Sequence, residues 1–264
     1  MIVTSASNPK FKNLLLLQEK SKARREQGLF VVEGRRELEH CIEAGFHVRT
    51  VFVCPEIAGE AAGETLSSAP VIEIPAPLYR KAAYRESTEG VMAEVEVPER
   101  RLEDLQLPEN PLVMVLESVE KPGNLGAVLR SADAAGVSAV LVCDPLTDLW
   151  NPNLIRASIG AIFTVPTVAC SSADAIAFLK ARGNRILTAQ LQDSSLYYNI
   201  DMTRGTALVM GTESTGLTGQ WRAAADAHIR IPMLGRLDSL NVSVSAAILL
   251  FEAVRQRQSG PEEG

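Results

Sequence analysis

The stretch LVMVLESVEKPGNLGAVLRSADAAG, residues 112–136, decides the fold class. Its first part, 112–119, is an almost unbroken apolar run, which is typical of a strand buried on both faces of a parallel sheet. A loop at 120–123 follows, and the spacing of the apolar residues predicts a helix over 124–136. A buried strand that leads through a turn into a helix is the repeating unit of an α/β fold.

The same alternation continues toward the end of the chain. Strands are expected at 138–143, 165–169, 185–190, 206–211 and 229–231, and helices at 151–163, 173–182 and 241–258. This rhythm predicts a domain over 112–258 with a largely parallel sheet covered by helices. The polar residues 259–264 are expected to form a flexible tail.

The N-terminal part of the chain shows a similar but shorter pattern. Helices are expected at 8–27, 34–44 and 77–86, and strands at 29–33, 48–53, 71–74 and 90–97. Residues 1–97 therefore form a smaller α/β domain of their own. The stretch 98–111 contains three prolines and is interpreted as the linker, because repeated proline blocks helices and central strands.

Length and composition narrow the class of protein. The 264 residues suit two domains, and 46% hydrophobic with 22% charged residues is typical of a globular protein. No apolar stretch approaches the ~20 residues of a membrane span, and residues 1–8 lack the pattern of a secretory signal. The four cysteines show no CxxC spacing and the three histidines form no cluster, so we expect reduced thiols, a cytoplasmic location and no metal.

Charge is distributed unevenly. The chain carries a net charge of −6, but residues 1–36 hold eight Lys and Arg against three Glu. A basic segment on an acidic protein is expected where the chain contacts phosphates of a nucleic acid. The alternative is a solvated amphipathic helix that buries only its leucines.

Three polar clusters follow buried strands of the second domain. The first, KPGNLGAVLR at 121–130, presents backbone N–H groups at a helix start, although Asn124 could simply cap the helix. The second, GTESTGL at 211–217, places Glu213 just past a strand end, where α/β proteins bind ligands. The third is IPM at 231–233 with DSLNVSVS at 238–245, which holds more polar groups than a capping box can use.

In this order the clusters read NxGxxxR, GxExxGL and IPM with SLNVSVS. The sequence thereby resembles the SpoU/TrmH family of RNA ribose 2′-O-methyltransferases, in the SPOUT superfamily, from residue 112 to about 257. Residues 151–163 also match. The N-terminal part is similar to the substrate-binding domain of many members, through residues 2–12, Arg25 and 28–34.

The resemblance implies a fold and a set of partners. The C-terminal sheet would contain a deep trefoil knot, and the chain would form a homodimer with its active site near the subunit interface. S-adenosylmethionine would be the methyl donor, and RNA would be the methyl acceptor. The implied residues are Gly211, Ile231, Leu240, Met210 and Met233 for the donor, Asn124, Arg130, Glu213, Ser239 and Asn241 for catalysis, and Lys10, Lys12, Arg25 and Arg156 for RNA.

The catalytic roles follow from the resemblance and from side-chain chemistry. A guanidinium keeps its proton at neutral pH, so Arg130 is expected to bind the adjacent RNA phosphate and stabilise the developing alkoxide, oriented by Glu213. Asn124, Ser239 and Asn241 would place the ribose and the donor. We expect 23S-type ribosomal RNA as substrate. The alternatives are a tRNA 2′-O-methyltransferase and a non-catalytic RNA-binding or ribosome-assembly protein.

Overall fold

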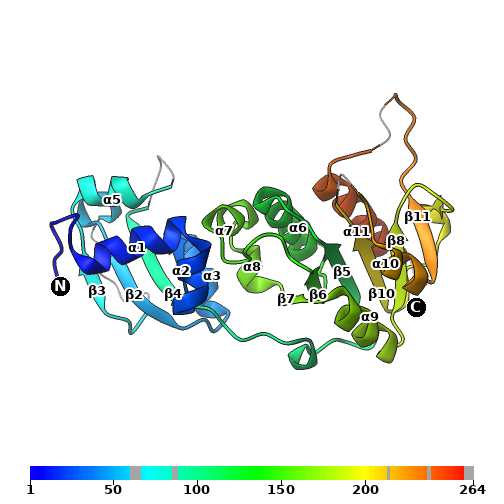
Figure 1. The fold of residues 1–264 in the computed structure, drawn as a ribbon, viewed down its shortest axis with the longest axis horizontal. Coiled ribbons are helices and arrows are strands. Elements are labelled where there is room, and N and C mark those ends of the chain that lie inside the picture. The colour runs from blue at the N-terminus through cyan, green and yellow to red at the C-terminus, as the bar shows by residue number, and fades with distance from the viewer. Residues whose placement is uncertain (60–66, 85–88, 213–214, 237–238, 259–264) are drawn as a thin grey trace. The chain divides into compact units, whose positions relative to one another are not determined.

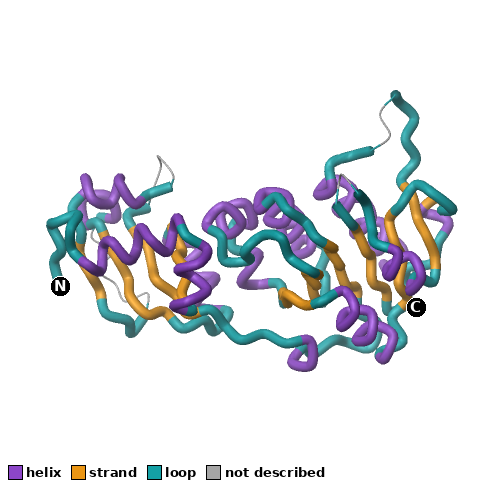
Figure 2. The backbone as a smooth tube through the Cα atoms, in the orientation of Figure 1, coloured by secondary structure: helices purple, strands orange, loops and turns teal. Residues whose placement is uncertain are grey.

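The computed structural model describes residues 1–59, 67–84, 89–212, 215–236 and 239–258. The chain divides into two compact units, one of Met1–Glu99 with Asp148–Thr164 and the other of Arg100–Thr147 with Val165–Gly264. Figure 1 follows the chain from end to end, and Figure 2 separates its helices from its strands. Both units combine helices with a β-sheet, which confirms the predicted α/β class.

The second unit is built on a seven-stranded sheet in which every pairing is parallel. The order across the sheet is β7-β6-β5-β10-β8-β11-β9. The strands are β5 (Leu112–Glu117), β6 (Ala139–Cys143), β7 (Thr167–Cys170), β8 (Arg185–Ala189), β9 (Ser195–Leu196), β10 (Thr206–Met210) and β11 (Ala227–Arg230). β9 was not predicted, because two residues are too short to show a hydrophobic period.

Two pairs of helices cover this sheet. They are α6 (Pro122–Ala134) with α11 (Val242–Gln258), and α9 (Ser172–Ala181) with α10 (Gly219–Ala224). Val113 and Val115 of β5 share a buried cluster with Trp221 of α10. Because side chains alternate along a strand, Met114 and Leu116 point to the opposite face. Apolar residues on both faces of β5 explain why its sequence shows no alternation.

The first unit contains a four-stranded sheet of order β1-β4-β2-β3, in which only β2 and β3 are parallel. The strands are β1 (Leu29–Glu33), β2 (Val48–Val53), β3 (Val71–Glu73) and β4 (Val91–Glu96). The helices before α6 are α1 (Pro9–Glu19), α2 (Ser21–Gln27), α3 (Arg35–Glu43), α4 (Pro55–Ala58) and α5 (Ala76–Ala82). α1 buries Phe11, Leu14 and Leu17 in one cluster with Phe52 and Met92 of the sheet.

The single helix predicted over 8–27 is wrong. The chain is extended at Lys20, with φ −114° and ψ 109°, and this residue separates α1 from α2. The buried Arg24 explains the break, because its Nη1 donates to the carbonyl oxygens of Leu17 (2.6 Å) and Gln18 (3.1 Å). A side chain thus satisfies carbonyls that a continuing helix would have used.

The helix predicted over 151–163 is also two helices, α7 (Pro152–Ser158) and α8 (Ala161–Thr164). Ile159 and Gly160 between them have positive φ values of 51° and 86°, which end a right-handed helix. Residues 259–264, predicted as a tail, lie outside the described residues.

The segment 148–164 belongs to the first compact unit, although the predicted domain limits place it within 112–258. Trp150 stacks on Phe30 with ring centroids 4.5 Å apart, and Phe163 meets the edge of Phe46 at 5.2 Å. Asp148 Oδ2 accepts a hydrogen bond from Nε of the buried Arg24 at 2.6 Å. Aromatic packing and a buried ion pair therefore hold this excursion of the chain on the first unit.

No helix among the described residues is long and apolar enough to cross a membrane.

Candidate functional site

A cavity of about 470 Å³ lies at the carboxyl ends of β8, β10 and β11 in the second unit. We call it the strand-end cavity. Its walls come from the ends of these strands, from the segments that follow them, and from the start of α11. Parallel strands place their carboxyl ends at one edge of the sheet, so segments that are far apart in sequence meet there.

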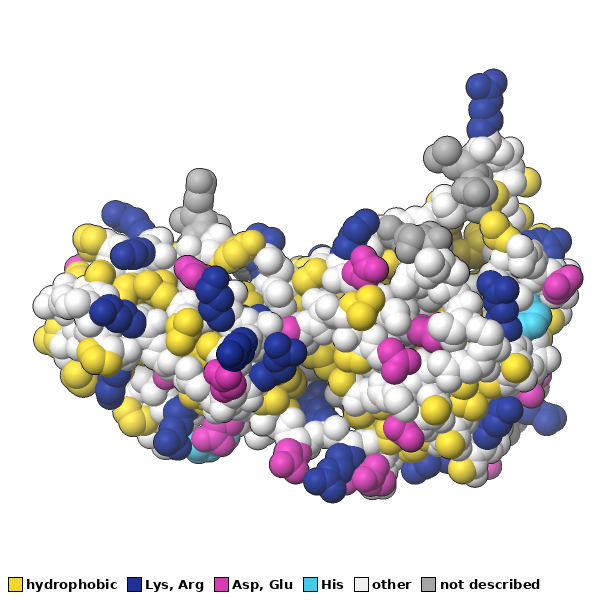
Figure 3. All heavy atoms as spheres, in the orientation of Figure 1, with side chains coloured by type: hydrophobic (Ala, Val, Ile, Leu, Met, Phe, Trp, Pro, Cys, Tyr) yellow, Lys and Arg dark blue, Asp and Glu magenta, His cyan; other side chains and the backbone are white. Residues whose placement is uncertain are grey.

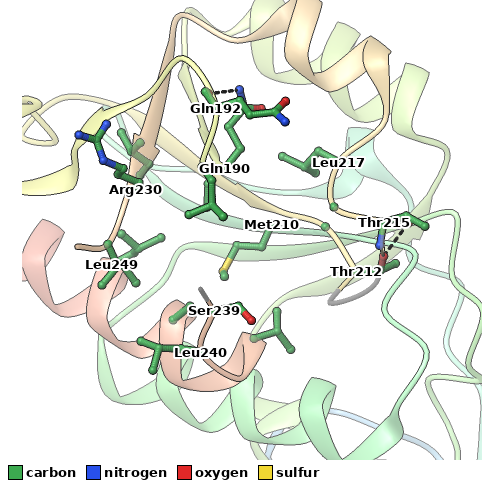
Figure 4. A pocket seen from close by; sticks show the side chains of 18 of the residues that line it. Gln190, Gln192, Met210, Thr212, Thr215, Leu217, Arg230, Ser239, Leu240 and Leu249 are labelled. Carbon is green, nitrogen blue, oxygen red and sulfur yellow. Dashed lines mark hydrogen bonds between the residues drawn. The ribbon is translucent and has the colours of Figure 1, made fainter. Parts of the chain in front are cut away.

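All five residues predicted to bind the donor line the strand-end cavity: Met210, Gly211, Ile231, Met233 and Leu240. Figure 4 shows the Met210 side chain projecting from the end of β10 into the space bounded by Ser239, Leu240 and Leu249. Ser239, predicted to be catalytic, also lines this cavity. The structure thus brings together residues from the second and third of the sequence clusters.

Gly211 and Thr212 lie close against Thr215 and Gly216. A Cβ atom at Gly211 would overlap the backbone carbonyl of Gly216, so only glycine fits there. Thr212 accepts a hydrogen bond from the Gly216 amide at 3.1 Å, and its Oγ1 accepts one from the Thr215 amide at 3.0 Å. Glu213, predicted to orient Arg130, lies outside the described residues.

Gln190 was missed by the sequence analysis. It follows β8 directly and lines the strand-end cavity, and its Nε2 donates to the carbonyl of Gln192 at 2.9 Å. Within the described part of the chain its Oε1 is buried without a hydrogen-bond partner. A buried orphan acceptor is unfavourable unless a ligand supplies a donor. The sequence analysis placed Gln190 at the end of the strand predicted over 185–190, and a polar residue at the carboxyl end of a parallel strand was the available signal.

A smaller cavity of about 110 Å³, here called the side cavity, adjoins the first and shares Gly211, Thr212 and Val242 with it. Asn124 of α6 lines the side cavity, and its Oδ1 accepts a hydrogen bond from Asn241 Nδ2 at 3.2 Å. Asn241 Oδ1 also accepts from the Ser243 amide at 2.9 Å. Asn241 therefore both caps the start of α11 and joins it to α6.

Arg130 does not lie with Asn124 and Asn241. It is exposed on α6, six residues after Asn124, which corresponds to about 240° around the helix. Among the described residues it lines neither the strand-end cavity nor the side cavity. Its guanidinium is therefore available to a ligand outside the two cavities.

Three predicted RNA-binding residues, Lys10 and Lys12 of α1 and Arg25 of α2, are exposed on the first unit. We call them the basic surface. Figure 3 shows Lys and Arg side chains scattered over the part of this unit that carries α1 and α2. Arg24, in contrast, is buried against Asp148 and does not belong to the surface.

The fourth predicted RNA-binding residue, Arg156, is exposed on α7. Its guanidinium lies 4.8 Å from the centroid of the Tyr84 ring, and its Nη2 donates to Asn153 Oδ1 at 3.4 Å. Tyr84 is itself about half exposed, so the pair forms a flat cationic and aromatic surface on the first unit.

One acidic group lies close to the basic surface. Burial raises the pKa of Glu94 above its ordinary value, while hydrogen bonds from Asn13 and Thr50 and the charges of Lys10 and Arg49 act in the opposite direction. Asn13 Nδ2 donates to Glu94 Oε1 at 3.1 Å. The hydrogen bond between Asn13 and Glu94 thus joins α1 to β4.

Comparisons with known proteins match both parts of the chain. Residues 111–251 match the SpoU rRNA Methylase family, and residues 8–93 match an MRM3-like substrate binding domain. A 23S rRNA (uridine(2479)-2′-O)-methyltransferase of Streptomyces viridochromogenes is 30% identical over 97% of this chain and 93% of its own length. A tRNA (guanosine(18)-2′-O)-methyltransferase of Escherichia coli strain K12 is 41% identical, but over 56% of this chain and 65% of its own.

A solved structure extends the similarity to the whole fold. The crystal structure of an AdoMet bound rRNA methyltransferase from Sinorhizobium meliloti is 31% identical and superimposes with a TM-score of 0.88. The match covers 97% of each chain.

Proposed function

The chain belongs to the SpoU rRNA Methylase family, and from this premise we propose that it transfers a methyl group from S-adenosylmethionine to a ribose 2′-hydroxyl of 23S ribosomal RNA. One observation carries the proposal: Met210, Gly211, Ile231, Met233, Ser239 and Leu240 surround one cavity at the carboxyl edge of the sheet. That cavity is of a size that small-molecule ligands occupy, about 300–1,000 Å³.

The strand-end cavity fits the donor. Gly211 lets backbone approach closely, as the absence of room for a Cβ demonstrates, and Ile231 and Leu240 supply apolar surface for an adenine ring. The buried Gln190 Oε1 would accept a hydrogen bond from an N–H group of the ligand. When bound, S-adenosylmethionine supplies a methyl group already activated by the sulfonium charge.

The remaining task of the protein is to align the ribose and stabilise one developing negative charge. Asn124 and Asn241, joined at 3.2 Å beside the strand-end cavity, are the groups we assign to the ribose, together with Ser239. Arg130, exposed on α6 outside both cavities, would bind the neighbouring RNA phosphate as a protonated guanidinium. Glu213 remains the candidate to orient it.

The RNA would be held by the basic surface and by Arg156, through phosphates and stacking. We favour 23S rRNA over tRNA as the substrate. The 23S rRNA methyltransferase aligns along nearly the whole of this chain, whereas the tRNA methyltransferase aligns with little more than half of it. The match of 8–93 to a substrate-binding domain supports the same choice. The expected location is the cytoplasm, which agrees with four free thiols.

Two further features of the family are part of this proposal. We expect a deep trefoil knot formed by the segments around 211–218 and 231–241, which contribute to one cavity. We also expect a homodimer, supported by Val244 and Phe251, which lie two turns apart on α11 and are 47% and 48% exposed.

The test is methyl transfer from labelled S-adenosylmethionine to unmodified total RNA, followed by separation of large rRNA, small rRNA and tRNA. Label at one alkali-resistant linkage of the large rRNA is the expected result. Label confined to tRNA would establish the tRNA alternative. Donor binding without transfer to rRNA or its assembly intermediates would favour the non-catalytic assembly protein, and absence of donor binding would contradict the enzyme.

A further inference from the structure

Glu117 is a buried carboxylate that none of the predicted roles uses. It is the last residue of β5 and is 1% exposed. Its Oε2 accepts from the Thr218 amide at 2.8 Å, and its Oε1 accepts from Thr218 Oγ1 at 2.7 Å. Both carboxylate oxygens are therefore directed at one residue, which lies 101 positions later in the chain.

A second set of contacts, centred on the Ser172 hydroxyl, also reaches this carboxylate. Ser172 Oγ lies 3.2 Å from Glu117 Oε1 and 2.6 Å from Asp144 Oδ2, and it accepts from Trp221 Nε1 at 2.9 Å. The hydroxyl carries one hydrogen, so the shorter contact identifies Asp144 as its main acceptor. The network joins the ends of β5 and β6 to α9 and α10.

The position of Glu117 relates it to the strand-end cavity. Met210 pairs with Leu116 across β10 and β5, so Gly211 follows beside Glu117. The chain then runs through the segment 211–217, five of whose members line the cavity, and returns to Glu117 at Thr218. Both ends of this segment are thus held at the same point of the sheet.

We propose that Glu117 is a positioning residue for methyl-donor binding, because its two hydrogen bonds to Thr218 hold the neighbouring Gly216 and Leu217 against Gly211, which lines the cavity. The inference rests on the proposed function, since it assumes that the strand-end cavity takes S-adenosylmethionine. Glu117 touches no ligand in this scheme. It acts through Thr218, whose side chain does not line the cavity.

The alternative is that Glu117 merely stabilises the fold. Burial of a carboxylate is unfavourable unless it is well hydrogen-bonded, so its partners are important for stability in either case. The two roles differ in what they predict for ligand binding. If Glu117 only stabilises the fold, replacing its hydrogen-bond partner lowers the melting temperature and leaves the donor affinity of the folded molecules unchanged. If Glu117 is a positioning residue, the same replacement lowers the donor affinity itself.

The experiment compares Thr218→Val and Glu117→Gln with the parent protein, by calorimetric titration with S-adenosylmethionine in the absence of RNA. Thr218→Val removes one hydrogen bond to the carboxylate and keeps the backbone one. Because hydrogen bonds to charged groups are stronger than neutral ones, we expect the donor Kd to rise about tenfold. Thr218→Ser, which restores the hydroxyl, should return it to within about twofold of the parent.

Thr206→Val is the matched control. Thr206 begins β10 at the end remote from Gly211, is 1% exposed, and donates from Oγ1 to the Arg204 carbonyl at 2.8 Å. The same chemical change is made there in a more buried place. Its donor Kd should equal that of the parent, whatever happens to its melting temperature.

The possible outcomes distinguish failure of this inference from failure of the proposed function. A raised donor Kd in Thr218→Val and Glu117→Gln, with normal binding in Thr218→Ser and Thr206→Val, supports the inference. Parental affinity in Thr218→Val and Glu117→Gln overturns it and leaves the methyltransferase proposal standing. Failure of the parent itself to bind S-adenosylmethionine overturns the proposed function and this inference together.

Discussion

The strand-end cavity of the second unit is enclosed by backbone and by mostly apolar side chains, whereas the basic surface of the first unit consists of exposed Lys and Arg side chains. The cavity depends on close approach, as at Gly211, where no Cβ fits. The basic surface depends on charge and has no enclosing walls. One region can therefore recognise shape, and the other can attract phosphates from a distance.

Because of this difference, substitutions in the two regions should have distinguishable effects on ligand binding. Donor binding should respond to changes of atomic volume, because the backbone at Gly211 leaves no room for an added Cβ. RNA binding should respond to charge and fall steeply with salt. The substitutions at Gly211, at Arg130 and in the basic surface test whether the two regions are independent in this way.

Gly211→Ala is expected to have the largest effect. The new methyl group would overlap the Gly216 carbonyl, which cannot move aside by a rotamer change, so the donor Kd should rise about 100-fold. Calorimetric titration with S-adenosylmethionine measures it. Gly219→Ala is the control, because a Cβ there meets nothing within 4 Å. Normal donor binding by Gly211→Ala would show that the segment 211–218 does not need its close contact.

Arg130→Lys comes next. Lysine keeps the charge but loses the planar fork, so turnover with RNA should fall about 30-fold while donor affinity stays unchanged. The measurement is kcat under saturating donor and RNA. Arg182→Lys, a change at an exposed arginine beside Phe178, should leave turnover at the parental value. Full turnover by Arg130→Lys with unchanged RNA affinity would contradict bidentate phosphate binding.

Neutralising the basic surface should have a smaller effect, confined to RNA. In the triple variant Lys10→Gln, Lys12→Gln and Arg25→Gln, RNA affinity should fall about tenfold near 0.1 M salt, with a shallower salt dependence. Donor affinity should not change. Filter binding over a salt series provides the measurement.

Arg24→Gln is the contrasting control for that triple variant. It removes one positive charge from the same pair of helices, but the charge is buried against Asp148. We expect a lower melting temperature and an unchanged salt slope. Equal loss of RNA affinity in both variants would mean that fold stability, rather than exposed charge, controls RNA binding.

The smallest expected effect concerns pH. Burial raises the pKa of Glu94, so the folded state binds this proton more tightly than the unfolded state. The contribution of Glu94 to stability is present below the ordinary carboxyl pKa and is lost as pH rises through the folded pKa. Denaturant unfolding of the parent and of Glu94→Gln across this window should show a difference that grows with rising pH. A constant difference would contradict the raised pKa.

The sequence predicted most strands of the seven-stranded sheet, but it did not predict where two of the expected helices are interrupted. Apolar runs such as 112–119 and 206–211 report burial of a strand, which is a local property. The break at Lys20 depends on the side chain of Arg24, which donates to the Leu17 and Gln18 carbonyls and is itself held by Asp148, 124 positions away. The break at Ile159 lies in a segment that packs on the first unit, where Trp150 stacks on Phe30. Local propensity contains no information about such pairs.

In the candidate site, too, some residues could be predicted from the sequence and others could not. Gly211, Ile231 and Leu240 were found by motif, and their meeting in one cavity follows from the shared edge of parallel strands. Gln190 and Glu117 were not found. Gln190 is a single polar residue after a strand, and Glu117 ends an apolar run without any motif of its own. The structure shows their importance through the buried Oε1 atom of Gln190 and the buried carboxylate of Glu117.

The excursion of residues 148–164 onto the first unit has a consequence for synthesis on the ribosome. Residues 1–99 emerge first, but their aromatic side chains Phe30 and Phe46 lack Trp150 and Phe163 until 65 further residues, 100–164, have been translated. At roughly 5–20 residues per second, this leaves several seconds of incomplete burial. The N-terminal half therefore completes its folding only after translation of the second unit has begun.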